Sequence, residues 1–364
     1  MNVLWDMRLF STGYRNRGIG RYCFEVARSM LAKHPDCSIF LWGAPHRLPP
    51  ELHTPPVTII PYHSGTWKTS VFRLPFLVLN YRINLLHYWV ALGPLSSVGI
   101  TPFPLVPTVA TIHDLGVELW DTPHARFVRR TPYWRLQRRF MTTVSAIMTN
   151  SITTYGDIDA TLPLSGKPHI TAYPPFPSSG SRPVPASGRK PYLIALGGAP
   201  HKNLFRIITA FTQVRAVRPE IRLILLGDTD SAEHLPIPLP AGIIREPSME
   251  RSIMHLRQCG GLVFCSLHEG LGLPPIEAMV HGCPLLLSDI PSLRETCGSS
   301  ARFVDPLSVE SITGGMSDIL EHSDAWCRKA AEGAKTYTGM SNDTPERIFH
   351  LYKEITGLPV RHDT

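Results

Sequence analysis

The sequence predicts an α/β protein made of two doubly wound units, each a parallel sheet covered by helices. Short apolar or β-branched runs alternate with longer amphipathic segments from end to end, which is typical of strand–helix–strand units. The chain has 364 residues, and a prior of about 150 residues per domain indicates two domains. A segment dense in Pro, Gly and Ser at 174–191 separates two such series, so we place the domain boundary there.

The first unit is expected to contain seven strands, because seven short runs are rich in apolar and β-branched residues. They lie at 2–5, 37–43, 57–60, 85–89, 107–113, 146–150 and 169–173. Helical segments lie between several of them. We assign residues 1–175 to an N-terminal Rossmann-like domain and residues 176–190 to a linker.

The second unit repeats this alternation at 191–343 as a C-terminal Rossmann-like domain. Its expected strands are 192–197, 221–227, 242–246, 261–266, 284–289 and 301–305, with helices from 203, near 249–258 and near 274–281. After about 308 only helical segments remain. Thr344 is expected to cap a last helix with Pro345 at its first position, and residues 344–364 are expected to pack back on the N-terminal domain.

Composition favours a cytoplasmic protein, soluble or peripheral at a membrane. No apolar run approaches the roughly 18 residues that a membrane span needs, and the first ten residues do not resemble a secretory signal. The seven cysteines are odd in number and none are spaced as CxxC, so we expect reduced packing cysteines. The histidines never form HExxH, and we expect no metal and no cofactor. Asp228-Thr229-Asp230 matches an Asp-x-Asp metal motif, but it follows a predicted strand and is interpreted as a turn.

The formal charge of +7 is unevenly distributed. Residues 1–180 hold 17 Lys and Arg against 9 Asp and Glu, a balance of +8, so the remainder carries −1. A basic half attracts phosphates, nucleic acid or anionic lipid. No nucleic-acid-binding motif is present, which favours anionic lipid or a phosphorylated substrate and predicts no nucleic-acid partner.

Two glutamates flank a Gly-rich turn in "LHEGLGLPPIEAMVHG", residues 267–282. The turn follows the predicted strand 261–266 and leads into a helix that has prolines in its first turn. Gly270 and Gly272 would let backbone amides approach an anion at the helix N-terminus. Glu269 would face that ligand, and Glu277 could accept hydrogen bonds from ribose hydroxyls. The alternative is that Glu277 is a solvated carboxylate that complements the helix dipole.

A second Gly-rich turn, "ALGGAPHKNLF" at 195–205, follows the first strand of the same unit. Lys202 beside it is suited to neutralise a departing phosphate, and Gly198 and Asn203 belong to the same turn. A surface lysine before a helix is the alternative. The glycines form neither GxGxxG nor GxxxxGK, so dinucleotide and P-loop sites are not indicated.

The E-x7-E spacing of "EGLGLPPIE", followed by "AMVHGCPLLLSD", "LRET" and "ARFVDP", closely resembles the retaining family 4 glycosyltransferases. That family has the GT-B fold, two facing Rossmann-like domains with a cleft between them. The resemblance implies that Glu269 and the amides of Gly270, Leu271, Gly272 and Leu273 contact the donor sugar and its diphosphate. It also implies that Glu277 holds the ribose and Lys202 the phosphates. Family members often have an Arg where this chain has Gly197 and Gly198. Lys202 would therefore act with help from His201, Arg206 or an arginine of the other domain.

Two motifs of the N-terminal half extend the resemblance. "RNRGIGRY" at 15–22 places Gly18 and Gly20 in a loop that the family brings near the donor diphosphate. "ATIHDLG" ends a strand with His113, where the family commonly has a His near the transferred sugar; a packing histidine is the alternative.

The segment 126–158 also resembles the family, in its Arg-rich helix that leads to a strand and then to a Ser-Thr-rich turn. Thr131-Pro132 should start a helix in which Arg135, Arg138 and Arg139 share one face, while Trp134, Phe140 and Met141 point elsewhere. The functional interpretation is contact with anionic lipid or a lipid-diphosphate acceptor, and the alternative is a solvated helix face.

The resemblance implies a retaining, metal-independent hexosyltransferase of cell-surface glycan synthesis, such as that of lipopolysaccharide, O-antigen or another polysaccharide. The "RGIGRY" stretch is most similar to bacterial mannosyl- or rhamnosyltransferases that use GDP-sugars, with a lipid-linked saccharide as acceptor. The alternatives are a nucleotide-sugar epimerase on the same fold, and a non-catalytic subunit that binds a sugar nucleotide.

Overall fold

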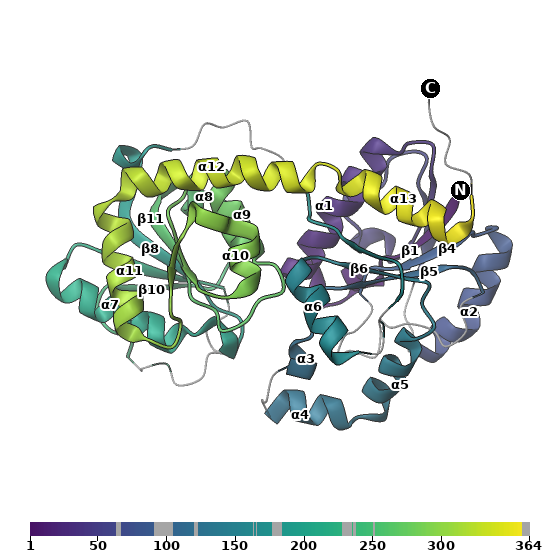
Figure 1. Cartoon of the computed structure of the whole chain (residues 1–364), viewed down its shortest axis with the longest axis horizontal. Coiled ribbons are helices and arrows are strands. Elements are labelled where there is room, and N and C mark those ends of the chain that lie inside the picture. The colour runs from purple at the N-terminus through teal and green to yellow at the C-terminus, as the bar shows by residue number, and fades with distance from the viewer. Residues whose placement is uncertain are drawn as a thin grey trace. The chain divides into compact units, whose positions relative to one another are not determined.

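The computed structural model describes residues 1–62, 67–90, 105–119, 123–162, 164, 166–176, 184–227, 235, 238–249 and 252–358. The chain forms two compact units (Figure 1). Unit 1 is Met1–Pro175 with Ser341–Thr364, and unit 2 is Phe176–Met340. The last helix, α13, therefore belongs to the unit that begins the chain.

Unit 1 is built on a seven-stranded sheet in the order β3-β2-β1-β4-β5-β6-β7, in which every neighbouring pair is parallel. Its strands are β1 (Asn2–Asp6), β2 (Ser38–Gly43), β3 (Thr58–Pro61), β4 (Leu85–Tyr88), β5 (Thr108–Ile112), β6 (Ala146–Thr149) and β7 (His169–Thr171). All seven predicted strands are present.

The helices of unit 1 are α1 (Gly18–Lys33), α2 (Trp67–Asn80), α3 (Gly116–Leu119), α4 (Pro123–Arg130), α5 (Pro132–Met141), α6 (Ile152–Thr161) and α13 (Thr344–Thr356). α5 starts as predicted, because the Thr131 side chain accepts a hydrogen bond from the amide of Trp134. The predicted cap of α13 is wrong. Asp343 occupies the N-cap position, and the Thr344 hydroxyl instead donates to the carbonyl oxygen of Tyr173 at 2.8 Å, which fastens α13 to unit 1.

Unit 2 is built on a six-stranded parallel sheet in the order β10-β9-β8-β11-β12-β13. Its strands are β8 (Lys190–Leu196), β9 (Arg222–Leu226), β10 (Ile243–Glu246), β11 (Cys259–Phe264), β12 (Leu285–Ser288) and β13 (Arg302–Val304). The helices are α7 (Leu204–Val217), α8 (Ser252–Gln258), α9 (Leu273–Val280), α10 (Pro291–Cys297), α11 (Val309–Glu321) and α12 (Ser323–Ser341). The predicted strands are again all present.

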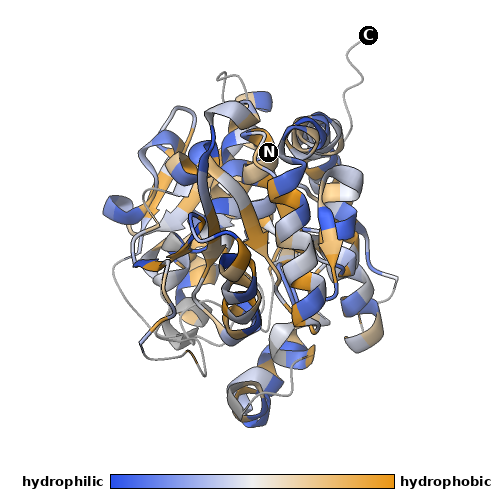
Figure 2. Ribbon diagram, turned by 90° about the vertical axis from the view of Figure 1, so that its left-hand side faces the viewer, coloured by the Kyte–Doolittle hydropathy of each residue, from blue (hydrophilic) through white to orange (hydrophobic). Residues whose placement is uncertain are grey.

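The core of each unit lies between its sheet and the covering helices. In Figure 2 the hydrophobic residues gather in the strands, while the outer sides of the helices are largely hydrophilic. In unit 2 the strand residues Leu193, Leu223 and Leu286 pack against Phe211 of α7 and Ile312 of α11. All seven cysteines are buried and unpaired, which agrees with the prediction of reduced packing cysteines.

Both sheets reverse their strand order next to their first strand, between β1 and β4 in unit 1 and between β8 and β11 in unit 2. Ligands of open α/β sheets bind at such reversal points, beyond the carboxyl ends of the strands. The loops after β8 and β11, which carry Lys202 and Glu269, are therefore at the position that the fold favours for a ligand.

Candidate functional site

The candidate site of unit 2 is centred on an ion pair between its two Gly-rich turns. Lys202 Nζ lies 2.7 Å from Glu269 Oε1 and 4.6 Å from the ring centroid of Phe264. The Lys202 side chain is 18% exposed and that of Glu269 13%. The pair is therefore shielded, yet a ligand can reach it, and the two residues predicted from separate motifs are in direct contact.

Asn203 holds the two turns together. Its backbone is left-handed, with φ of 60°, and its Nδ2 donates to the carbonyl oxygens of Cys265 at 3.0 Å and Pro306 at 2.8 Å. Arg206 donates to its Oδ1 at 3.0 Å. This side chain was predicted to bind the donor, but its amide is buried and committed to the protein. In the structure it positions Lys202.

The charge of Glu269 depends on its neighbours. Burial would raise the pKa of this carboxyl, but the positive charges of Lys202 and His201 and the Lys202 hydrogen bond together lower it below the usual value. Glu269 is therefore ionised at neutral pH. It accepts hydrogen bonds and does not act as an acid.

The turn after Glu269 leads into α9. Gly272 has a φ of 85°, and a Cβ at this position would lie 2.5 Å from Cδ2 of Leu293, so both conformation and space require glycine. α9 begins at Leu273 with prolines in its first turn. The amides of Gly270, Leu271, Gly272 and Leu273 thus lie at a helix N-terminus, where an anion is favoured. Glu277 lies about one turn into this helix and is half-buried.

The turn after β8 has an open position next to Lys202. Gly198 has a φ of 110°, and no atom lies within 4 Å of where a Cβ would stand. Of the residues of unit 2 suggested to help Lys202, His201 is close enough to influence the Glu269 pKa, whereas Arg206 is turned to Asn203.

The candidate site of unit 1 contains His113, which is buried directly after β5. Its Nε2 lies 2.8 Å from the carbonyl oxygen of Trp89. A carbonyl only accepts, so Nε2 carries the proton and Nδ1 keeps its lone pair. Burial lowers the pKa of His113, outweighing the Trp89 hydrogen bond and the charge of Asp114. His113 is therefore neutral and offers Nδ1 as an acceptor.

A buried hydrogen-bond chain lies behind Trp89 and was not predicted. Trp5 Nε1 donates to the hydroxyl of Tyr352 at 3.2 Å. The same hydroxyl is hydrogen-bonded to Nδ1 of His87, and Nε2 of His87 is hydrogen-bonded to Thr111 Oγ1 at 2.7 Å. The His87 ring also stacks on Trp89, with 4.5 Å between centroids. Tyr352 lies on α13, so the last helix is linked to the strand ends that position His113.

Gly18 and Gly20 begin α1, as the first residue of that helix and two residues into it. A Cβ on Gly20 would lie 2.5 Å from the carbonyl oxygen of Tyr14 and 2.6 Å from that of Arg15. The close approach of the preceding turn accounts for glycine at position 20 without a ligand.

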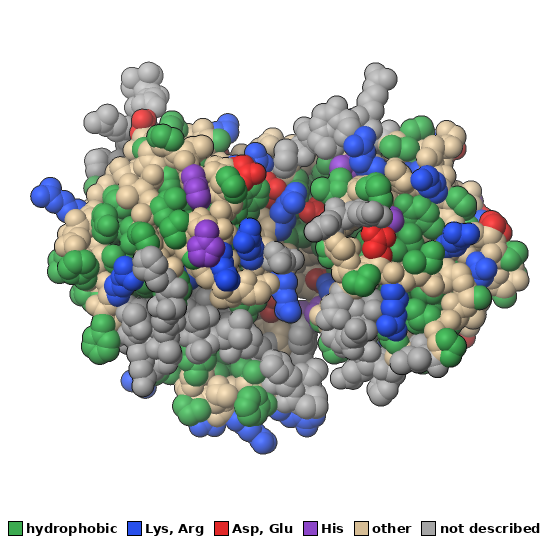
Figure 3. Space-filling view, turned by 180° about the vertical axis from the view of Figure 1, so that it is seen from behind, with side chains coloured by type: hydrophobic (Ala, Val, Ile, Leu, Met, Phe, Trp, Pro, Cys, Tyr) green, Lys and Arg blue, Asp and Glu red, His purple; other side chains and the backbone are tan. Residues whose placement is uncertain are grey.

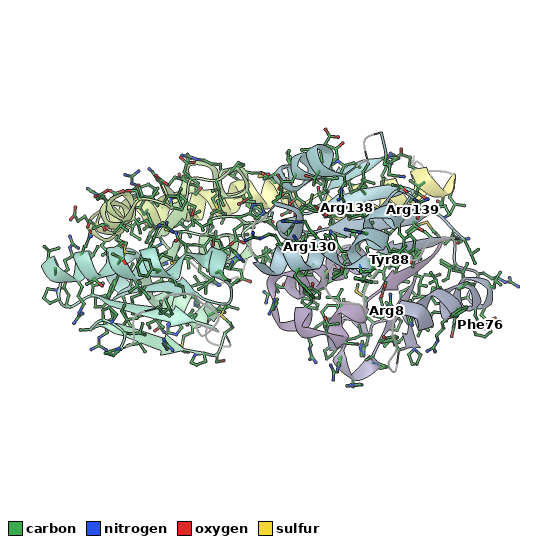
Figure 4. The ribbon with its side chains drawn as sticks, turned by 90° about the horizontal axis from the view of Figure 1, so that it is seen from below. Arg8, Phe76, Tyr88, Arg130, Arg138 and Arg139 are labelled. Atoms are coloured by element: carbon green, nitrogen blue, oxygen red, sulfur yellow. The ribbon has the colours of Figure 1, made fainter. Side chains whose placement is uncertain are left out.

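The three arginines of α5 do not act as one face. Arg135 and Arg139 are exposed, but Arg138 turns to the protein. Its Nε lies 3.4 Å from Glu118 Oε1, and its NH2 donates to the carbonyl oxygen of Thr161 at 3.2 Å. The Arg138 side chain is still 39% exposed, so it differs from Arg135 and Arg139 mainly in that the buried Glu118 carboxylate pairs with its guanidinium. Figure 4 labels Arg138 and Arg139.

A second charged pair was also missed. Arg8, after β1, is buried and bonds Asp6 through Nε at 2.7 Å and NH2 at 2.6 Å. Its guanidinium lies over the Trp42 ring, 4.1 Å from the centroid, and Tyr88 contributes to its surroundings (Figure 4). The sequence signal that could have predicted this pair is "WDMR", residues 5–8, where Asp6 and Arg8 carry opposite charges at the end of an apolar strand. The Asp228-Thr229-Asp230 motif lies outside the described residues.

Two family models match the chain over adjacent stretches. Glycosyltransferase Family 4 matches residues 16–173 and Glycosyl transferases group 1 matches residues 181–337. The chain is 25% identical over 291 residues to the O-antigen chain mannosyltransferase RfbU of Salmonella typhimurium, covering 75% of this chain and 78% of that protein. It is 28% identical over 323 residues to the MMP alpha-(1->4)-mannosyltransferase of Mycolicibacterium hassiacum, covering 81% and 78%.

Solved structures have the same fold. Anabaena Alr3699/HepE in complex with UDP and glucose superposes with a TM-score of 0.69 at 15% identity, covering 96% of this chain and 98% of that one. The fold is therefore GT-B. Together with the two matched models, which meet near the boundary between the units, this shows that the chain belongs to the family 4 glycosyltransferases.

Proposed function

We propose that this glycosyltransferase moves a mannose- or rhamnose-like hexose from a nucleotide diphosphate sugar, most simply a GDP-sugar, to a hydroxyl of a lipid-linked or polysaccharide acceptor. The relatives RfbU and MMP alpha-(1->4)-mannosyltransferase are named as mannosyltransferases, and the former acts on an O-antigen chain. Both favour a mannosyl donor, and RfbU also favours a cell-surface glycan. We place the enzyme in the cytoplasm, peripheral at the inner membrane.

The observation that carries the proposal is the Lys202–Glu269 pair at the strand-order reversal of unit 2. A diphosphate leaves with growing negative charge, and a fixed ammonium group and helix-terminal amides stabilise that charge. We assign Lys202 and the amides of residues 270–273 to the diphosphate. This arrangement of cation and amides needs no metal ion.

Glu269 and Glu277 are assigned to hydroxyl groups of the donor. Because Glu269 is ionised, it accepts hydrogen bonds from the sugar and orients the anomeric carbon. Glu277, half-buried one turn along α9, accepts from the ribose. His113 accepts from a sugar hydroxyl through Nδ1, since its Nε2 proton is held by Trp89.

The reaction proceeds with retention of configuration by attack on the same face of the sugar. The bond between the anomeric carbon and the phosphate oxygen breaks, and the acceptor oxygen forms the new bond to that carbon. The acceptor proton passes to the departing phosphate oxygen. The protein supplies charge and orientation but no nucleophile. The proton that the acceptor loses is the one that the departing phosphate gains.

The test is a thermal-shift panel of GDP-, UDP-, ADP- and dTDP-sugars, followed by transfer from the responding donor to a polyprenyl-diphosphate saccharide. A ligand that binds only the native state raises the melting temperature. We expect a response to GDP-mannose or a GDP-linked deoxysugar, and an α-linked product by NMR.

Two other outcomes would overturn the proposal. Conversion of the donor to its epimer without acceptor would indicate an epimerase. Donor binding without transfer to any acceptor would indicate a non-catalytic subunit.

A further inference from the structure

The outward side of α2 carries large apolar side chains exposed to solvent. Phe72 is 82% exposed, Phe76 61% and Leu79 73%. Their spacing of four and three residues puts them on one stripe of the helix. The opposite side of α2 is also apolar, but it is buried in the core of unit 1. Monomeric proteins rarely expose a contiguous group of this kind without a partner for it.

α5 lies on the same side of the sheet as α2. Leu74 and Leu77 of α2 belong to one core cluster with Phe140 and Met141 of α5. Two helices that pack on one face of a sheet turn their outer sides away from it together (Figure 1). The exposed stripe of α2 and the outer side of α5 are therefore parts of one layer of the surface of unit 1.

The outer side of α5 is basic. Arg135 and Arg139, four residues apart, are exposed, and the described part of the chain places no carboxylate on either. The surrounding sequence has the same character, because residues 52–113 and 122–156 contain no Asp or Glu at all. At the lower edge of Figure 3 hydrophobic and basic side chains lie next to each other. Phe127 of α4 is 69% exposed.

This combination identifies the partner by its chemistry. A second copy of the chain in a two-fold dimer would bring the same acid-free, basic surface against itself, and like charges would oppose that contact. An anionic lipid bilayer offers phosphates for the arginines and an apolar interior for the phenylalanines and leucine.

We propose that the outer sides of α2 and α5 form a docking surface for an anionic membrane. Phe72, Phe76 and Leu79 enter the boundary between headgroups and acyl chains, while Arg135 and Arg139 contact lipid phosphates. Arg138 is not part of the surface, since Glu118 holds it. The inference deepens the proposed function, which it takes as its basis for a lipid-linked acceptor, but the binding itself requires no reaction.

The test is sedimentation of the full chain with vesicles of phosphatidylethanolamine and phosphatidylglycerol, compared with phosphatidylcholine alone. The wild type should bind the anionic vesicles and not the neutral ones. A triple variant, Phe72→Ser with Phe76→Ser and Leu79→Ser, should bind at least about 30-fold more weakly, because three inserted side chains are lost. Arg135→Gln with Arg139→Gln should weaken binding about 20-fold, and added salt should remove most of that difference.

Matched controls come from exposed residues of unit 2. Phe205→Ser with Val217→Ser removes side chains that are 51% and 77% exposed there, and Arg222→Gln removes an exposed cation. Neither should change vesicle binding. Circular dichroism should show unchanged melting of all variants, since only exposed side chains are altered.

Undiminished vesicle binding by the triple variant would overturn the proposal. So would a wild-type dimer that the triple variant converts to monomers, because the stripe would then be a protein interface. Transfer to a water-soluble acceptor should be unchanged in the triple variant. If the wild type binds vesicles but never transfers a sugar, the proposed function fails while the docking surface stands.

Discussion

Unit 1 and unit 2 share parallel sheets with a strand-order reversal beside the first strand, but they place different chemistry at their strand ends. In unit 2 the centre is an ion pair, Lys202 with Glu269, beside a helix N-terminus. In unit 1 the histidine His113 is neutral and is backed by uncharged hydrogen bonds that reach α13. Unit 1 also has a charged pair at its strand ends, Arg8 with Asp6, but both side chains are fully buried. The pair that a ligand can reach is therefore in unit 2, and the groups around His113 are uncharged.

This difference suits a reaction in which charge develops on only one group. The departing diphosphate gains negative charge, so cations and amide dipoles stabilise its transition state most. The sugar hydroxyls stay neutral, and a neutral imidazole with a fixed tautomer is sufficient to orient them. The comparison can be tested by substitutions in unit 2 and by substitutions in unit 1.

The largest effect is expected from the charged half. Lys202→Ala should lower the rate of sugar transfer by about 100- to 1000-fold, because the cation that stabilises the leaving group is lost. Initial rates with the donor identified by thermal shift measure this. Lys190→Ala, an exposed lysine at the start of β8, is the matched control and should keep the wild-type rate.

The Glu269→Gln variant distinguishes the role of Glu269 from the role of Lys202. It keeps the shape of the side chain and leaves Lys202 without its counter-charge. Transfer should fall, but the affinity for the nucleotide diphosphate alone should not, since we propose that Lys202 holds that ligand. A Lys202→Ala enzyme that retains more than a tenth of the wild-type rate would show that the ion pair serves the fold and not the reaction.

The next effect concerns the uncharged half. Tyr352→Phe removes the hydroxyl that links Trp5 Nε1 to His87 Nδ1 and leaves both buried groups without their partner. Each such loss typically costs about 1–3 kcal/mol, and two groups lose their partner, so we expect the free energy of unfolding to fall by about 2 to 6 kcal/mol. Urea denaturation measures this.

The control for this change is Tyr81→Phe. Tyr81 is a half-buried tyrosine of the same unit whose ring packs on Phe40, and no hydroxyl bond is recorded for it among the described residues. Its loss should cost less than about 0.5 kcal/mol, as for an ordinary surface substitution. Equal costs for both variants would mean that the buried chain contributes nothing beyond packing.

The two halves also differ in how much the sequence revealed. Lys202 and Glu269 were predicted as site residues because each lies in a Gly-rich turn after an apolar strand, and because both motifs resemble the family 4 glycosyltransferases. Parallel strands bring such turns to one edge of a sheet. The strands themselves were predicted because their apolar runs are local features. The direct contact of Lys202 with Glu269 was not predicted, because it depends on the order of β8 and β11 in the sheet.

The uncharged chain escaped prediction for a different reason. His87 lies in "LLHYW", where it resembles any residue of a buried strand, and its partner Tyr352 is 265 residues away. The hydroxyl of Thr344 and the guanidinium of Arg138 likewise follow tertiary partners, Tyr173 and Glu118, in place of the helix positions that local rules gave them. Local patterns predict elements, whereas these contacts exist only once the elements are packed.

The last prediction uses protonation. Burial lowers the pKa of His87 to about 3, against an ordinary value of 6.5. The unfolded chain therefore takes up a proton below pH 6.5 that the native state refuses, and stability falls as the pH falls toward 3. The pKa of Glu269 is also lowered, from 4.5, so this group too stabilises the native state less as the pH falls. The native carboxylate releases its proton more readily than the unfolded one, so its contribution is intact above pH 4.5 and is lost only below that value.

Acidification from pH 7 to pH 5 should therefore weaken unit 1 before unit 2. The proton taken up by unfolded His87 lowers the free energy of unfolding by about 2 kcal/mol at pH 5. Buried His113 and half-buried His169 of unit 1 also have lowered pKa values and act in the same direction. Among the described histidines of unit 2, His281 has a lowered pKa. Hydrogen exchange read by mass spectrometry, with peptides assigned to each unit, measures the two separately. Faster exchange in β4 and β5 at pH 5, with β8 and β11 unchanged, is expected. Equal loss of protection in both sheets would show that the neutral histidines do not set the acid stability of unit 1.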